Sequence, residues 1–497
     1  MVPEASAGFL KDDSGVSKYP GSRVRLFARY LYNYKNLLQF GITGDKDAGE
    51  QFFRGSQKAG FDFYSWHLYV KQIGRLNSLA VGDYTISMGQ GLIHWQGNGL
   101  RKNADAMLVK RQGQTIRPYR SAGEHNFNRG VAASFRINKS ELTIFGSYRK
   151  LSASTDSDDA GPYVSSVVTS GYHRTVSEQQ KRKNLGVFTG GMILRYRFNK
   201  GSVAFNTIQH RYSLRLKQQD KPYDLYGING DYWANYSVDY SYTIRNLHSY
   251  GELAADRRGK FAITQGLLLG MDKKLDFSLV FRTLQAAYQS ISGNAFTEIS
   301  QPSNETGMYT GFVLRPRHGW SLSFYADFFR SPWLRYRTDM PAGGRGYMVQ
   351  VHHALKRGTE IYSRFSNEQK YLNVSGSEAV LPEIEFVSKK EWRVQFSHQF
   401  SKVILFRSRV SASWFGVIGD AIPEKGFLAF TDMVWKPAKG MISGNIRLQY
   451  FDTGGYETRI YAYENGPLYD MSIPGFFDQG LRYYVNINLE PGDMLPM

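Results

Sequence analysis

Apolar and polar side chains alternate along most of this chain with a period of two residues. The alternation is clearest in four segments: Tyr236–Ile244, Ser321–Phe329, Met441–Phe451 and Leu481–Leu489. Successive side chains of a β-strand point to opposite faces, so each segment predicts a strand with one apolar and one polar face. In the second segment we expect the apolar face to carry Leu322, Phe324, Ala326 and Phe328, and the polar face to carry Ser323, Tyr325 and Asp327.

The connections between these segments alternate between short and long. Short turns are expected at Tyr34–Asn36, Asn138–Ser140, Asn199–Gly201, Asp272–Lys274 and Arg317–Gly319. Long polar loops are expected at Asp45–Ala59, Leu151–Gly186, Leu214–Gly230, Ala286–Glu305, Arg330–Gly344 and Lys370–Ser388. Outer-membrane barrels have short periplasmic turns and long extracellular loops in this order. We therefore predict an all-β fold, a large antiparallel transmembrane β-barrel of about 20–24 strands.

The composition narrows the class of membrane protein. Aromatic residues make up 15% of the 497 residues, yet the mean hydropathy is only −0.43. A helical membrane protein needs runs of about 20 apolar residues, and none occurs here. A membrane barrel alternates its apolar band with polar residues and places aromatic residues at both membrane interfaces. The composition therefore favours the cell outer membrane, with membrane lipid and lipopolysaccharide as partners and other envelope proteins as further candidates.

The chain is strongly basic, with 62 Lys and Arg against 43 Asp and Glu and a net charge of +19. A charge on the lipid face at mid-membrane costs about 2–4 kcal/mol per residue. Arginines in the polar register should therefore face the barrel interior, where they would favour anionic cargo. The arginines expected to line the lumen are Arg23, Arg25, Arg29, Arg136, Arg149, Arg195, Arg197, Arg282, Arg447 and Arg482. Arg364 and Arg409 also fall on polar faces.

The chain shows no internal division by composition. We expect an N-terminal extension over 1–22, one transmembrane barrel over 23–489 and a C-terminal tail over 490–497. A barrel of more than about sixteen strands encloses an aqueous channel unless it is plugged. A plug would have to come from the chain's own long loops, from a region outside this sequence or from a partner.

A set of short motifs runs through the chain: Gly60–Ser65, Leu79–Tyr84, Met88–Leu92, Ile116–Tyr119, Ser170–Thr175, Gly293–Phe296, Ser331–Arg335 and Arg459–Asn465. In combination they resemble a Bacteroidetes family of outer-membrane β-barrels known as helix-hairpin-helix domain-containing proteins. The resemblance covers nearly the whole chain and implies a barrel. Family members also carry helix-hairpin-helix repeats and one further strand at each end, which this chain lacks. We therefore expect a barrel truncated at both ends, and a nucleic-acid partner stays open.

Three patterns could bind ligands, and each has a simpler structural explanation. The glycine-rich stretch Gly82–Gly91 lacks the following helix of a phosphate-binding loop, so a bend or close backbone approach is expected. Basic and aromatic residues interleave as on nucleic-acid surfaces, but neighbours on a strand face opposite sides. Histidines without metal-ligand spacing are His67, His94, His125, His173 and His210.

The loop around His173 also contains candidate catalytic side chains. Ser170 and Ser177 lie close to His173 in the sequence, and three aspartates precede it: Asp156, Asp158 and Asp159. A Ser/His/Asp triad is defined by geometry, and the chain has no Gly-x-Ser-x-Gly elbow. The aspartates also lack the twelve-residue pattern of a calcium loop. We therefore expect a polar loop with no catalytic residue, no metal and no cofactor, and a protein that is not an enzyme.

These observations predict an outer-membrane conduit, or a component of a transport or secretion assembly, with an arginine-rich lumen that favours anionic cargo. Two alternatives stay open. One is a protein associated with DNA binding or uptake, acting through a helix-hairpin-helix region outside this chain. The other is a non-conducting structural subunit of an outer-membrane complex.

Overall fold

The computed structural model describes residues 2–3, 6–99, 101–355, 358–374, 376, 379, 383–419, 422–437, 442–466 and 471–489. The predicted tail, 490–497, lies outside the described residues.

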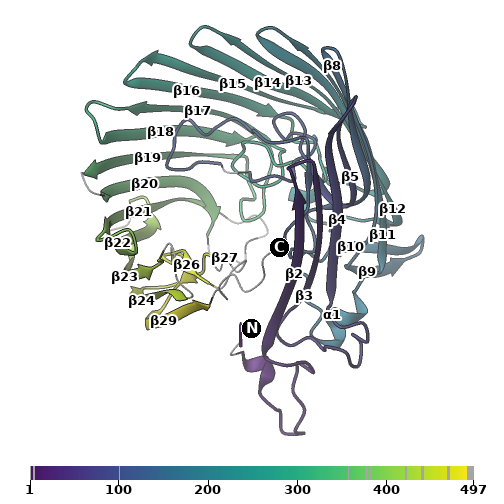
Figure 1. Cartoon of the computed structure of the whole chain (residues 1–497), viewed down its shortest axis with the longest axis horizontal. Coiled ribbons are helices and arrows are strands. Elements are labelled where there is room, and N and C mark those ends of the chain that lie inside the picture. The colour runs from purple at the N-terminus through teal and green to yellow at the C-terminus, as the bar shows by residue number, and fades with distance from the viewer. Residues whose placement is uncertain are drawn as a thin grey trace. The chain divides into compact units, whose positions relative to one another are not determined.

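Antiparallel β-strands make up most of the described chain (Figure 1). The long strands are β2 Val24–Tyr34, β3 Leu38–Lys46, β4 Phe63–Ile73, β5 Leu76–Ile86, β7 Asn128–Ile137, β8 Ser140–Leu151, β11 Leu185–Phe198, β12 Gly201–Leu216, β13 Gly230–Ile244, β14 Leu247–Asp256, β15 Phe261–Asp272, β16 Leu275–Leu284, β17 Glu305–Leu314, β18 Trp320–Ser331, β19 Ala342–Leu355, β20 Thr359–Asn373, β21 Ile384–Gln399, β22 Ile404–Val417, β23 Glu424–Trp435, β24 Ile442–Thr453 and β29 Gln479–Leu489. These 21 strands fall within the predicted number.

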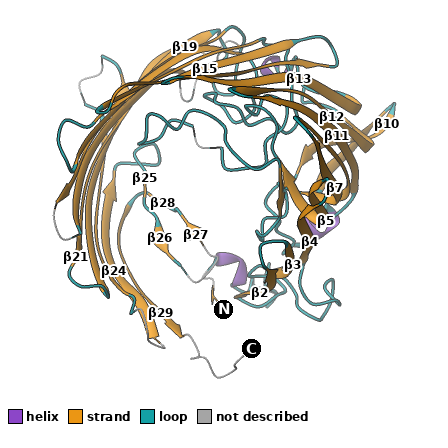
Figure 2. Cartoon of the chain, turned by 45° about the horizontal axis from the view of Figure 1, so that its top comes forward, coloured by secondary structure: helices purple, strands orange, loops and turns teal. Residues whose placement is uncertain are grey.

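The remaining elements are short. The short strands are β1 Val2–Pro3, β6 Ile116–Pro118, β9 Ala153–Asp158, β10 Gly161–Val167, β25 Ile460–Tyr461, β26 Glu464–Asn465, β27 Met471–Ser472 and β28 Gly475–Phe476. The helical elements described are η1 Ala7–Phe9, α1 Val176–Gln180 and η2 Pro222–Asp224 (Figure 2). None of the helices in the described part of the chain has the length and apolar character to span a membrane.

The predicted two-faced strands are present. In β18, Ser323, Tyr325 and Asp327 are buried, whereas Phe328 on the other face is 54% exposed and Phe324 is half-buried. The register predicted for this strand is therefore confirmed. Its neighbours pair with it in simple antiparallel ladders, Phe324 opposite Phe312 of β17 and opposite Val349 of β19.

Large apolar side chains are exposed on one face of strand after strand. In β29 these are Leu481, Tyr483, Val485, Ile487 and Leu489, and in β24 they are Ile446, Leu448 and Tyr450. Exposed apolar surface on this scale is unfavourable in water, at about 25 cal/mol per Å², and suits contact with lipid. Together with the antiparallel hairpins, this face confirms the predicted class, an antiparallel β-barrel of outer-membrane type.

Short and long connections alternate as predicted. The turns between β2 and β3 and between β7 and β8 place Asn36 and Asn138 at φ 55° and 54°, a conformation that asparagine tolerates well in tight hairpin turns. The opposite ends of the strands carry the long loops, such as 47–62 and 152–184. One connection at this end is short, 257–260 between β14 and β15.

The chain divides into two compact units. Unit 1 comprises Met1–Arg101, Lys110–Gly266 and Arg282–Glu305. Its polar strand face is covered by two of its own loop segments, 87–99 and 285–304. The segments are joined by backbone hydrogen bonds from Trp95 to Ser292 and from Asn294 to Gly91, of 3.0 and 2.8 Å. The segments and the strands share an apolar core that includes Met88, Leu92, Ile93, Tyr288, Ala132, Ile193 and Ile208, all buried.

Unit 2 comprises Lys102–Val109, Leu267–Phe281 and Thr306–Met497. The segment Lys102–Val109 lies against β17 and β18, where the Ala106 N–H donates to Ser323 Oγ at 3.2 Å and Lys102 pairs with Asp327 at 3.1 Å. A second apolar cluster joins β23 to the loop after β24 and consists of Leu428, Phe430, Ile460, Ala462 and Phe476.

Candidate functional site

The predicted lumen arginines within strands lie on the face opposite the exposed apolar side chains. Arg195 and Arg197 of β11, for example, alternate with Leu194 and Tyr196, each 48% exposed on the other face. Arg23 precedes β2 and is exposed, with its guanidinium over the Phe9 ring.

Six of the ten predicted arginines form ion pairs with carboxylates. The pairs are Arg25 with Asp45 and Asp47, Arg136 and Arg197 with Glu141, Arg282 with Glu305, Arg447 with Asp432, and Arg482 with Glu464. The Arg282 and Arg447 side chains are each only 1% exposed. Much of the predicted positive charge is therefore compensated within the fold.

Three predicted arginines contact neutral oxygens. Arg149 donates to the carbonyl oxygens of Glu124, His125 and Phe127. Arg29 donates to Thr43 Oγ1 and to the Arg120 carbonyl, and Arg195 donates to Thr115 Oγ1 at 3.4 Å. These arginines hold loop segments against the strands.

A row of arginines crosses three adjacent strands of unit 2. Arg364 of β20 lies directly opposite Arg393 of β21, and Arg409 of β22 lies opposite Gln395 of β21. Side chains directly opposite on paired strands have Cβ atoms about 4.5–5.5 Å apart. We call Arg364, Arg393 and Arg409 the arginine row.

Two members of the arginine row, Arg364 and Arg409, donate hydrogen bonds to neutral amides. Arg364 Nε donates to Gln350 Oε1 at 2.8 Å, and Arg409 donates twice to Gln395 Oε1, at 3.0 and 2.8 Å. Glu391 lies two residues before Arg393, and its carboxylate pairs with Lys389 at 3.7 Å. Because amide oxygens carry no formal charge, Arg364 and Arg409 keep most of their positive charge.

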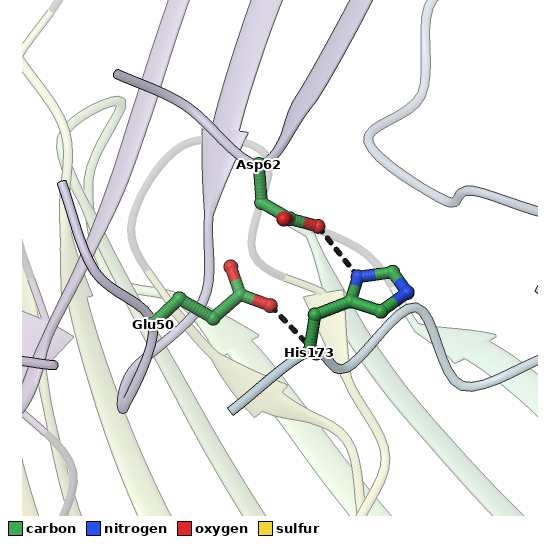
Figure 3. Close-up of side chains that lie close together, drawn as sticks. All are labelled: Glu50, Asp62 and His173. Atoms are coloured by element: carbon green, nitrogen blue, oxygen red, sulfur yellow. Dashed lines mark hydrogen bonds and ion pairs between the residues drawn. The ribbon is translucent and has the colours of Figure 1, made fainter. Parts of the chain in front are cut away.

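A second group of functional side chains gathers in the loops of unit 1. Glu50 and Asp62 come from the loop after β3, and His173 comes from the loop after β8 (Figure 3). His173 Nδ1 lies 2.7 Å from Asp62 Oδ2, and the His173 backbone N–H donates to Glu50 Oε1 at 2.9 Å. All three residues are buried, and within the described residues they are a group that could hold a metal ion.

The carboxylate oxygens of this group already accept hydrogen bonds. Asp62 Oδ1 accepts from Gln57 and pairs with Arg182 at 2.9 Å, and Glu50 Oε2 accepts from the Asp47 N–H at 3.0 Å. The group is therefore held together as a hydrogen-bonded network in which Asp62 orients the histidine ring.

The other ring nitrogen of His173 faces a serine. Ser152 Oγ lies 3.0 Å from His173 Nε2 and accepts the backbone N–H of Lys183 at 3.2 Å. With Nδ1–H donating to Asp62, Nε2 is the acceptor for the Ser152 hydroxyl. Ser152, His173 and Asp62 thus form an ordered serine–histidine–aspartate chain, which we call the loop triad.

Several carboxyl groups around the loop triad are held with raised pKa values. Burial raises the pKa of Asp47 to about 6, with the Asp45 charge adding to it. Burial, with the charge of Asp62, also raises the pKa of Glu50. Burial raises the pKa of Glu124, in the loop before β7, to about 9. The loop region therefore carries less negative charge at neutral pH than its residues suggest.

The structure rearranges the loop chemistry expected from sequence. His173 pairs with Ser152 and Asp62 instead of Ser170, Ser177 or the three aspartates. Asp158 instead pairs with Arg215 and Lys217. Ser152, Asp62 and Glu50 were missed because they are far from His173 in the chain, and no local pattern marks them. Arg393 was also missed, although the alternation of Trp392, Val394 and Phe396 with Arg393 and Gln395 marks its face.

The glycine-rich stretch behaves as predicted. Gly82 has φ +91°, and an added Cβ would lie 2.4 Å from the Trp66 carbonyl oxygen. Gly91 has φ +85°, and its Cβ would lie 2.8 Å from the Asn294 carbonyl oxygen. Both sites are close backbone approaches, as the prediction for Gly82–Gly91 required.

No family model matches the chain, and no curated protein matches it. Among solved structures, it is similar to OmpT of Vibrio cholerae, at 7% identity and a TM-score of 0.32, over 72% of this chain and 99% of that one. It is similar to a BenF-like porin from Pseudomonas fluorescens, at 11% identity and a TM-score of 0.34, over 67% of this chain and 86% of that one. It is similar to Pseudomonas aeruginosa OccK3, at 11% identity and a TM-score of 0.33, over 86% of this chain and 88% of that one.

Proposed function

We propose that the protein is an outer-membrane conduit, or the barrel of a transport assembly, whose polar face favours anionic cargo. The observation that carries the proposal is the arginine row. Most predicted arginines elsewhere meet carboxylates or backbone oxygens, whereas Arg364 and Arg409 meet amide oxygens. Retained positive charge on a wall that borders water attracts anions and repels cations.

The apolar face supports the membrane part of this proposal. Its exposed side chains include Trp320, Trp392 and Trp435 together with many Tyr and Phe residues. Trp and Tyr are favoured at membrane–water interfaces because their rings are amphipathic. Lipid is therefore the proposed partner of this face.

Reversal potentials in a salt gradient test the conduit. The full chain is reconstituted in planar bilayers, and we expect chloride to be preferred over potassium, with a preference that weakens as salt rises because mobile ions screen the row. A variant with Arg364, Arg393 and Arg409 changed to Gln should lose the preference.

A charge-matched control separates the row from net charge. Arg245, Arg317 and Lys273 are exposed in or beside short turns, and changing all three to Gln removes the same total charge. This control should keep the anion preference. Cation preference in the unaltered protein, or equal effects of the two triple variants, would contradict the proposal, and absence of any conductance would support the structural-subunit alternative.

A further inference from the structure

We infer that the loop triad is a hydrolytic site for carboxylic esters of anionic amphiphiles at the membrane interface. This inference concerns the loops of unit 1 and is independent of ion conduction. It rests on three observations: the hydrogen-bonded order of Ser152, His173 and Asp62, the support of that order by further buried contacts, and a cavity beside the serine.

The geometry meets the requirements of nucleophilic catalysis. Ser152 Oγ and His173 Nε2 are 3.0 Å apart, and His173 Nδ1 and Asp62 Oδ2 are 2.7 Å apart. Both distances lie within hydrogen-bond reach for a nucleophile, its base and the group that orients the base. His173 and Asp62 are each only 2% exposed.

The aspartate and histidine are fixed from several sides. Arg182 and Gln57 bind the second oxygen of Asp62, and Glu50 holds the backbone N–H of His173. These contacts come from two loops, 47–62 and 152–184, and they fix the ring so that Nε2 points at the serine. A polar loop that only contacted solvent would not need so many hydrogen bonds and ion pairs among its own buried groups.

A cavity of about 350 Å³ opens beside Ser152. Its apolar lining includes Phe127, Tyr64 and Tyr148, and its basic lining includes Arg149 and Lys183. Tyr64 and Tyr148 are also 42% and 59% exposed on the apolar face of β4 and β8. The cavity therefore borders the face that contacts lipid, at the strand ends where an interface would lie.

The lining indicates the class of substrate. Aromatic rings suit an acyl chain, and the nearby cationic groups suit a phosphate or carboxylate head. An acyl ester of an anionic lipid offers both groups on one molecule, with the ester bond between them. Such a molecule could reach the cavity from the membrane without crossing water.

The proposed reaction uses no group beyond the chain, the ester and water. Ser152 Oγ bonds to the ester carbonyl carbon while its proton passes to His173 Nε2. The Lys183 backbone N–H donates to Ser152 Oγ at 3.2 Å and helps to hold that oxygen beside the histidine. The carbon–oxygen bond to the alcohol then breaks, and His173 returns the proton to that alcohol. Water attacks the acyl carbon and gives a proton to His173, and the fatty acid leaves as Ser152 regains its hydrogen.

Labelling and hydrolysis with the refolded full chain test the inference. A fluorophosphonate probe should label the protein once, and p-nitrophenyl esters should be hydrolysed. Ser152→Ala should abolish the labelling and lower hydrolysis by at least about 100-fold, the order of effect of losing a nucleophile or base. Asp62→Asn should lower hydrolysis while leaving Ser152 present. Ser177→Ala is the matched control, since Ser177 is exposed in the same loop and should change neither readout.

Hydrolysis of lipid vesicles of two compositions tests whether the site prefers an anionic head group. Phosphatidylglycerol vesicles should be hydrolysed faster than phosphatidylcholine vesicles if the basic lining selects the anion. Three results would overturn the inference: no labelling of a protein that migrates as folded, labelling that persists in Ser152→Ala, or zinc binding that requires Glu50, Asp62 and His173 in a protein without esterase activity. Equal rates on both lipids would overturn the head-group assignment.

Discussion

The polar strand faces of the two units differ in how the charge of some of their arginines is compensated. In unit 1 the chain's own loops cover this face, and arginines such as Arg282 are buried against carboxylates. In unit 2 part of the face carries the arginine row, whose members meet amide oxygens. An arginine is therefore a packing element where it is buried against a carboxylate, as at Arg282 and at Arg447 of unit 2, and a source of field where it meets amide oxygens.

This difference shows that the number of arginines on a polar face does not set its charge. Glu141 alone pairs with two of the predicted lumen arginines, and Asp432 pairs with both Arg407 and Arg447. A buried ion pair contributes little outward field, and an arginine beside a glutamine contributes most of its charge.

Removing a buried arginine of unit 1 should cost the most stability. Arg282→Met leaves Glu305 buried without the ion pair of 2.6 Å, and loss of one partner from a buried pair costs about 3–5 kcal/mol. The temperature at which the protein loses its folded gel mobility should fall sharply. Arg393→Met in unit 2 should change stability by less than about 1 kcal/mol, because it removes repulsion from Arg364. Similar losses of stability in the two variants would show that the buried arginine and the row arginine do not differ in their contribution to the fold.

Freeing an inner loop of unit 1 should have the next largest effect. Glu252 of β14 accepts the backbone N–H groups of Gln90 and Leu92, at 2.7 and 3.0 Å. Glu252→Leu leaves both donors buried without this acceptor, at about 1–3 kcal/mol each. Amide hydrogen exchange over 87–99 should accelerate. Glu368→Leu, on the polar face of unit 2, serves as the control and should leave that segment protected.

The loops around the loop triad should loosen at high pH. The pKa of Asp47 is raised to about 6 and that of Glu124 to about 9. The folded loops therefore hold these protons more tightly than the unfolded chain does. Stability from these groups is complete below the unfolded pKa, about 4, and is lost as the pH rises through 6 and 9.

Limited proteolysis within 47–62 and 119–127 measures this effect. Cleavage should be more than tenfold faster at pH 9 than at pH 5, after correction for protease activity, because the rise in the pKa of Glu124 alone exceeds one unit. Glu124→Gln should flatten the pH dependence. Cleavage of the unit 2 loop 332–341 is the internal reference, and a parallel rise there would point to a global cause.

An exposed ion pair of unit 2 should matter least. Arg337 and Glu457 lie 3.5 Å apart with side chains 55% and 34% exposed. Pairs of this kind contribute about 0–1 kcal/mol, so Arg337→Ala should leave the unfolding temperature almost unchanged. A loss as large as that of Arg282→Met would mean that exposure does not distinguish the arginines.

The strands, their two faces and the order of short and long connections could be predicted from the residues alone. These features are local, because the direction of each side chain depends only on its position in a strand. The register of β18 and the close approach at Gly82 followed from a few neighbouring residues. The polar-face position of Arg195 and Arg197 followed in the same way from the apolar residues between them.

Which charges are compensated, and which side chains meet, depends on how distant segments pack together. Arg282 and Glu305 form a buried ion pair although 23 residues separate them, and nothing near either residue in the sequence marks the pair. Asp62, Ser152 and His173 come from separate segments, and a triad depends on distances of about 3 Å that no spacing in a loop specifies. Alternation fixes the face on which a side chain lies, whereas its partner depends on how the loops fold over that face.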